Sequence, residues 1–313
     1  MYNVITNPKR IMLRPHSLIA LAGLLVCMTG FSGCNEGLGG GAAADLHVAI
    51  KLDAEAADDG GPGDSAETTV EVAGYGQATG RILVEGEPPQ YPPPVTQATV
   101  KDPASCVLSK IPNERLVIGA DGGIANVFVF LGKAPPGTRR PETPPEEVVF
   151  DQQFCTFLPH ALFVQTEQPI RILNDDAVLH NVHTFPQRNS EVNQGIAGNN
   201  RTGFQIAYAR PEKVPVQVKC DVHPWMLAWH LPLDHPYGTV TADDGTFTIP
   251  DLPAGTHQLT LWHEALGVIS DEVEVTIEPD GTTTLPDISV SAARFTAGFR
   301  GEKPKTVVLS TIR

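Results

Sequence analysis

The sequence predicts an all-β protein built from two sandwiches. Gly and Pro are plentiful, 29 and 28 of 313 residues, and stretches with the 3.6-residue periodicity of an amphipathic helix are scarce. Short runs rich in β-branched side chains alternate with turn signals, which is typical of sandwiches made of short strands. The chain is long enough for two domains of ordinary size.

The charge balance argues against nucleic acid as a partner. Lys and Arg total 22 against 36 Asp and Glu, which gives a net charge of -14. The sequence contains no basic stripe that could neutralise phosphates.

Residues 1–33 have the pattern of an export signal. Three basic residues precede an apolar run from Leu18 to Cys27, and small residues follow before Cys34. The segment resembles a bacterial lipoprotein signal, in which cleavage leaves a lipid-bearing cysteine at the new N-terminus. That resemblance implies lipidation at Cys34 and an exported protein, periplasmic or at the cell surface, anchored to a membrane. Ordinary secretion without a lipid is the alternative.

Residues 34–75 are expected to form a flexible tether. They are rich in Gly, Ala and Asp and contain few aromatic residues. Such a segment buries too little apolar surface to offset the entropy lost on ordering.

The folded part is expected to begin near Gly76. Proline-rich connections and a polar, Asn-rich loop at 187–203 separate its β-prone runs. The predicted strands are 80–86, 116–119, 124–131, 148–150, 161–165, 170–174, 178–183, 204–208 and 214–220.

Alternation along two of these strands predicts which side chains point inward. Successive side chains of a strand face opposite sides. His180 therefore shares a face with Val178 and Val182, and Cys220 shares one with Val216 and Val218. Both His180 and Cys220 are expected to face the core.

The residues after 235 predict a second, smaller sandwich. Asp244-Gly245 is a hairpin signal, and Pro253-Ala254-Gly255 is a second turn. Runs at 272–277 and 283–290 complete the strands, and a basic tail at 292–313 follows.

The cysteines can be divided by expected role. Cys27 belongs to the export signal, Cys34 is the lipidation site, and Cys220 is a metal-ligand candidate. In an oxidising compartment the remaining pair, Cys106 and Cys155, is most simply a disulfide, with two separately buried thiols as the alternative.

Cys220, His223 and Met226 offer a thiolate, an imidazole and a thioether at three-residue steps. With His180 as a second imidazole, this set suits one copper ion that cycles between Cu(I) and Cu(II). A thioether is a poor zinc ligand, so copper is the predicted cofactor. Four other histidines are expected to be core or surface residues rather than metal ligands: His160, His230, His235 and His263.

The motif Asn-Asp-Asp-Ala-Val-Leu-His-Asn-Val-His at 174–183, followed by Cys-x-x-His-x-x-Met at 220–226, resembles the cupredoxins. The likeness is to the amicyanin and plastocyanin branch, and 150–231 is similar to plastocyanin-like or methylamine-utilisation-like proteins. It implies a Greek-key sandwich with His180, Cys220, His223 and Met226 as copper ligands. It also implies that Asn181 hydrogen-bonds across to the ligand loop and stiffens the site.

Residues 235–291 resemble the carboxypeptidase regulatory-like, transthyretin-like sandwich, on the motif Asp-Asp-Gly-x-Phe-x-Ile-x-x-Leu-Pro-x-Gly at 243–255. That module carries no peptidase chemistry. The copper domain is expected at 76–234. Because residues 76–132 also look like the start of a regulatory-like module, the copper domain can instead be inserted within that sandwich.

Two functions remain open from the sequence. The first is a membrane-tethered copper protein that passes single electrons to and from a redox partner protein. The second is a cell-surface binding module in which the metal only braces the fold or is stored. No Ser/His/Asp or paired-carboxylate pattern supports a hydrolase, so a carrier or binding protein is favoured over an enzyme.

Overall fold

A computed structural model of the chain describes residues 72–138, 144 and 146–299. The export signal, Cys34, the tether up to residue 71 and the tail from residue 300 lie outside the described residues. The described chain is all-β, as predicted, apart from the short helices η1 (Leu108–Lys110) and α1 (Ala292–Phe299). No helix in the described residues is long and apolar enough to cross a membrane.

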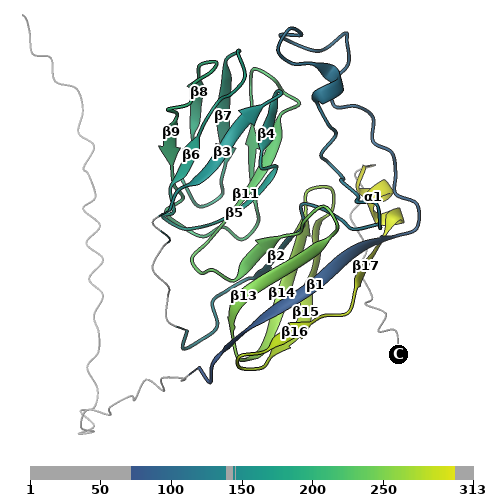
Figure 1. The fold of residues 1–313 in the computed structure, drawn as a ribbon, viewed down its shortest axis with the longest axis vertical. Helices are drawn as coiled ribbons and strands as arrows, with labels where there is room; N and C mark the ends of the chain where they lie inside the picture. The colour runs from purple at the N-terminus through teal and green to yellow at the C-terminus, as the bar shows by residue number, and fades with distance from the viewer. Residues whose placement is uncertain (1–71, 139–143, 145, 300–313) are drawn as a thin grey trace, which may run out of the picture. The chain divides into compact units, whose positions relative to one another are not determined.

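Residues 148–233 form the first sandwich, whose two sheets share one core (Figure 1). The larger sheet has the order β5-β11-β10-β7-β8, with β5 Ala161–Gln165, β7 His180–Phe185, β8 Asn193–Ile196, β10 Val216–Lys219 and β11 Leu227–Leu233. The smaller sheet has the order β4-β3-β6-β9, with β3 Val148–Gln153, β4 Thr156–Leu158, β6 Ile170–Ile172 and β9 Phe204–Ile206.

The second sandwich combines strands from two separated parts of the chain. One sheet has the order β12-β2-β14-β15, with β2 Phe128–Leu131, β12 Gly238–Val240, β14 Gly255–His263 and β15 Gly267–Ile277. The other sheet is built around β1, Tyr75–Glu85, which pairs with all three other strands. These are β13 Thr246–Pro253, β16 Thr282–Thr284 and β17 Ile288–Ser291.

Strands β1 and β2 precede the first sandwich in sequence but pair with strands that follow it. The first sandwich is therefore inserted, in sequence, between two parts of the second. In Figure 1 the blue strand β1 lies among green and yellow strands from the end of the chain. Ala78 and Ile82 of β1 are fully buried and belong to the same core cluster as Ile249 and Leu252 of β13. Strands β1 and β2 thus lie within the range 76–234 expected for the copper domain but pair with strands of the second sandwich, and the domain boundaries stay a prediction.

Some local expectations differ from the structure. Strand β8 lies within the expected loop 187–203. It pairs with β7, but three of its four residues are exposed and its sequence shows no apolar alternation. The turn at Asp244-Gly245 is present, yet β12 and β13 on its two sides pair with β2 and β1 rather than with each other. The predicted strand at 116–119 forms only an isolated bridge between Ile118 and Ile124.

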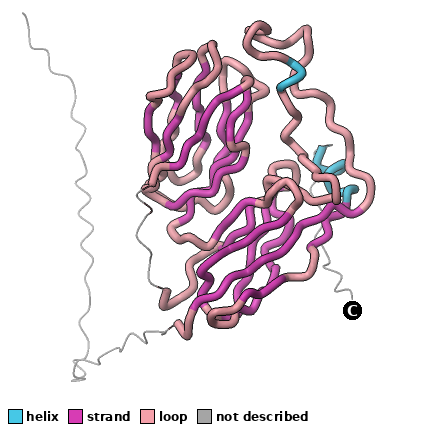
Figure 2. The backbone as a smooth tube through the Cα atoms, in the orientation of Figure 1, coloured by secondary structure: helices cyan, strands magenta, loops and turns pink. Residues whose placement is uncertain are grey.

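Between β1 and β2 the chain makes a long excursion, drawn as loop with η1 in Figure 2. Although it starts and ends in the second sandwich, its residues Val95, Cys106 and Ile111 are buried in the core of the first. The predicted disulfide between Cys106 and Cys155 is present and fixes this segment to the first sandwich. The excursion thereby reaches the candidate site.

Candidate metal centre

Pairing of β10 with β7 brings together residues that are far apart in sequence. His180 is the first residue of β7, Cys220 directly follows β10, and Lys219 pairs with His183. His180 and Cys220 are 0% and 1% exposed, so the inward directions expected from strand alternation agree with the structure. His223, also 0% exposed, lies in the turn that follows Cys220.

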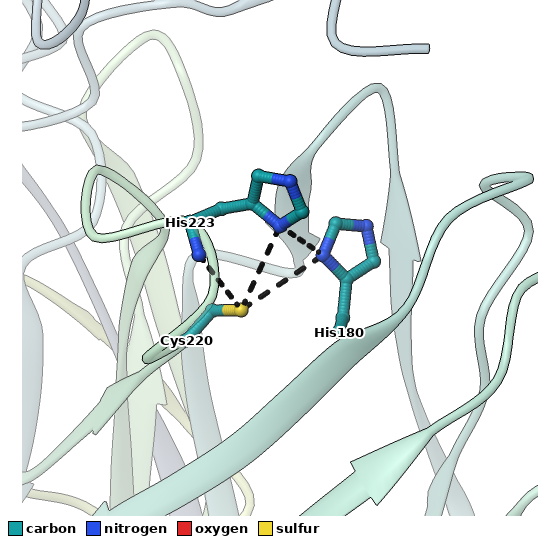
Figure 3. A group of neighbouring side chains, drawn as sticks. All are labelled: His180, Cys220 and His223. Atoms are coloured by element: carbon teal, nitrogen blue, oxygen red, sulfur yellow. Dashed lines mark hydrogen bonds between the residues drawn. The ribbon is translucent and has the colours of Figure 1, made fainter. Parts of the chain in front are cut away.

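Three donor atoms converge at this point (Figure 3). The Nδ1 atoms of His180 and His223 are 2.9 Å apart. The Sγ atom of Cys220 lies 3.8 Å from Nδ1 of His180 and 3.9 Å from Nδ1 of His223. The three side chains therefore turn their ligand-forming atoms toward one shared position.

These separations fit a single metal ion. Imidazole nitrogen binds a zinc-sized ion at about 2.0 Å and thiolate sulfur at about 2.3 Å. Donors at those distances and spread around one ion are separated by roughly 3 to 4 Å, as the three atoms are here. The donor set, with one thiolate and two imidazoles, suits copper or zinc.

The outer nitrogens of both rings are held by carboxylates. Nε2 of His180 lies 2.9 Å from Oδ2 of Asp176, and Nε2 of His223 lies 2.9 Å from Oδ2 of Asp102. An imidazole that donates from Nε2 to a carboxylate leaves Nδ1 to face a metal, an arrangement common at metal-binding histidines. Neither aspartate is among the site residues that the sequence predicts.

The surroundings of Cys220 favour its ionised form. Burial by itself raises the pKa of a thiol, but hydrogen bonds from His180, His223 and the backbone N–H of Asn181 outweigh burial. Together they lower the pKa of Cys220 to about 6. The thiolate is the form of cysteine that binds metals.

The pKa of His180 shifts in the opposite direction to that of Cys220. Burial disfavours the charged imidazole, but hydrogen bonds to Asp176 and Cys220 outweigh it and raise the pKa of His180.

Asn181 joins strand β7 to the ligand loop. Its side-chain oxygen accepts a hydrogen bond from the backbone N–H of Asp221 at 2.7 Å, and its Nδ2 donates to Oδ2 of Asp221 at 2.8 Å. Asp221 also accepts from His183, which faces away from the core. These hydrogen bonds connect β7 to the ligand loop, and the role of Asn181 in stiffening a copper site stays a prediction.

Met226 closes the ligand loop. Its backbone N–H donates to the carbonyl of His223 at 2.9 Å, and its carbonyl accepts from the N–H of Cys220 at 3.3 Å. The side chain is 1% exposed and belongs to the same core cluster as Cys220. Coordination by its thioether stays a prediction.

A cavity of about 550 Å³ adjoins the loop and is lined by Pro224, Trp225 and Met226, with Trp229 among its other residues. Trp225 donates from Nε1 to the carbonyl of Cys155 at 3.1 Å, and its ring lies 5.1 Å from that of His223. Trp225 therefore covers one side of the His223 ring.

The remaining buried histidines do not form a second centre among the described residues. His160 lies 2.6 Å from Glu264 and 3.4 Å from Glu114, through opposite ring nitrogens. Although burial opposes its charge, these two carboxylates raise its pKa to about 10. Burial instead lowers the pKa of His230 to about 3 and that of His263 to about 4.

A second cluster of potential donors overlaps the first, namely Cys155, Asp176 and His180. Cys155 is in the disulfide and offers no thiolate, so this cluster does not make a separate site.

Comparison with solved structures finds similarity to copper proteins. An amicyanin from Paracoccus versutus is 14% identical with a TM-score of 0.25, over 33% of this chain and 96% of that chain. A purple cupredoxin from Nitrosopumilus maritimus is 14% identical with a TM-score of 0.23, over 28% and 97%. A copper-containing nitrite reductase from Thermus scotoductus is 15% identical with a TM-score of 0.26, over 32% of this chain and only 25% of its own.

Comparison with protein families matches residues 220–285 to polysaccharide lyase family 4, domain II. The matched range starts at Cys220 and covers most of the second sandwich's later strands. The matched family differs from the carboxypeptidase regulatory-like sandwich expected at 235–291. The regulatory-like resemblance stays a prediction. No curated protein matches the chain in sequence.

Proposed function

We propose that this protein is a mononuclear copper protein that carries single electrons outside the cytoplasm. The observation that carries the proposal is the convergence of Sγ of Cys220 with Nδ1 of His180 and of His223 in a fully buried cluster. One thiolate and two imidazoles, with a weak thioether from Met226, form the ligand set of copper sites that transfer electrons.

Copper is favoured over zinc by the fourth ligand. Met226 is buried in the loop that also supplies Cys220 and His223, and a thioether is a soft ligand that suits copper but not zinc. A bound copper ion supplies one-electron chemistry by cycling between two oxidation states. The protein's own residues hold the ligands still, exclude water and keep Cys220 ionised.

Rigidity of the site suits electron transfer. The two hydrogen bonds between Asn181 and Asp221 tie the ligand loop to β7, and loop closure between Cys220 and Met226 limits movement of the sulfur. A site that changes little between oxidation states loses little energy to reorganisation. Four protein ligands leave no open position for a substrate, so we favour a carrier that meets a redox partner protein over an enzyme.

An exported location is supported by the disulfide between Cys106 and Cys155, because such bonds persist in oxidising compartments. Attachment to a membrane through a lipid at Cys34 is part of the proposal and rests on the sequence pattern of residues 1–33.

The test is to load the purified protein with Cu(II) and measure copper content, visible absorption and electron paramagnetic resonance. We expect one copper per chain, an intense thiolate-to-copper band and a small hyperfine coupling. His180→Asn and His223→Asn are expected to remove the band. His257→Asn, in the second sandwich, is the matched control and is expected to keep it. A colourless Cu(II) adduct of the unchanged protein would overturn the proposal.

A further inference from the structure

The outer edge of His223 is covered by a distant part of the chain. Asp102 lies in the excursion between β1 and β2, 121 positions before His223, and its Oδ2 is 2.9 Å from Nε2 of the ring. The side chain of His223 is 0% exposed, whereas that of Asp102 is 48% exposed. Asp102 therefore separates this ring from solvent and contacts it directly.

The outer edge of His180 has a comparable partner. Oδ2 of Asp176 lies 2.9 Å from Nε2 of His180 and also accepts a hydrogen bond from the backbone N–H of Cys155 at 2.8 Å. The side chain of Asp176 is 9% exposed. One carboxylate oxygen thus joins the His180 ring to the backbone of Cys155.

A single disulfide connects the two arrangements. The N–H of Cys106 donates to the carbonyl of Asp102 at 2.8 Å, so Asp102 and Cys106 belong to one turn. Cys106 is bonded to Cys155, whose N–H holds Asp176. The contacts therefore run without a gap from His223 through Asp102, the disulfide and Asp176 to His180.

We propose that Asp102 and Asp176 are positioning residues of the copper centre and that the Cys106–Cys155 disulfide holds both of them in place. This inference rests on the proposed copper function and adds to it. Each carboxylate accepts from Nε2, which turns Nδ1 toward the metal and fixes the ring's orientation. Each also places negative charge behind a ligand, which stabilises Cu(II) relative to Cu(I) and lowers the reduction potential.

The two aspartates differ in exposure, so removing their charges is expected to raise the reduction potential by different amounts. Water screens a charge at a half-exposed side chain more effectively than one at a buried side chain. Removing the charge of Asp176 is therefore expected to raise the reduction potential more than removing that of Asp102. Loss of such outer partners typically weakens metal binding about 10- to 100-fold.

The experiment compares the copper-loaded full chain with Asp102→Asn and Asp176→Asn. The asparagine keeps the size of the side chain and an accepting oxygen but removes the charge. Asp271→Asn, at an exposed position of β15, is the matched control because it makes the same change in net charge elsewhere. Potential, Cu(II) affinity and the electron paramagnetic resonance spectrum are measured for each protein, and circular dichroism checks the fold.

We expect both site variants to show raised potentials and altered spectra, with Asp176→Asn changed more, and the control to match the unchanged protein. Each tenfold loss of preference for Cu(II) over Cu(I) raises the potential by about 59 mV. The pair Cys106→Ser with Cys155→Ser is expected to shift the potential in the same direction, because it frees both aspartates.

Potentials and spectra of folded Asp102→Asn and Asp176→Asn that match the control would overturn the inference while leaving the copper function intact. Absence of a thiolate-to-copper band in the unchanged protein would instead overturn the copper function itself. If a variant does not fold, the serine pair tests the positioning role instead, and a potential and spectrum of the serine pair that match the control would overturn it.

Discussion

The Cys106–Cys155 disulfide is expected to contribute several kcal/mol to the stability of the metal-free protein. Its two cysteines are 49 positions apart and both are fully buried in the core of the first sandwich. A crosslink closing a loop of that length removes unfolded-state entropy worth about 4 kcal/mol at 25 °C. Cys106→Ser with Cys155→Ser is therefore expected to lower the free energy of unfolding by about 4 kcal/mol.

The assay is urea unfolding of the metal-free protein followed by tryptophan fluorescence, with and without a thiol reductant. Reductant is expected to destabilise the unchanged protein toward the level of the serine pair and to leave the serine pair itself unaffected. A loss below about 1 kcal/mol would contradict a stabilising role of this size for the disulfide. It would mean that the excursion carrying Asp102 is held by its apolar contacts rather than by the crosslink.

Three further predictions concern the site and its surroundings. Cys220→Ser is expected to keep the fold and abolish the thiolate-to-copper band in absorption spectra; a surviving intense band would contradict the ligand assignment. Because the folded pKa of His160 is raised to about 10, its stabilising contribution is full below about pH 6.5 and is lost as the pH approaches 10. Urea midpoints should fall over that range and fall less in Glu264→Gln; equal slopes would count against the ion pair. Asn181→Ala removes two hydrogen bonds to Asp221 and is expected to lower the free energy of unfolding, measured in urea, by about 1–3 kcal/mol. An unchanged urea midpoint would show that other contacts hold the ligand loop.

Strand alternation was sufficient to predict how the core ligands point. His180 shares its face with buried Val182, and Cys220 shares its face with buried Val216 and Val218, so the period of two predicted that both point toward the core. Strand β8 could not be predicted in this way, because Asn193, Gln194 and Gly195 are exposed and show no apolar alternation, although the strand pairs with β7.

Contacts between distant segments were beyond the reach of local patterns. Asp102 meets His223 across 121 positions of sequence, within a proline-rich stretch that has no periodicity. Asp176 has a local sequence signal, because it stands four positions before His180 in the same motif. The pairing of β1 with β13 likewise depends on packing of the whole second sandwich rather than on either strand alone.

The most direct test of the central claim is a reversible redox titration of the copper-loaded protein, followed through its visible band. We expect one electron per chain to bleach the band, reoxidation to restore it, and copper to stay bound throughout. Absence of the band, or loss of copper on reduction, would contradict a buried centre built from His180, Cys220 and His223 for carrying electrons.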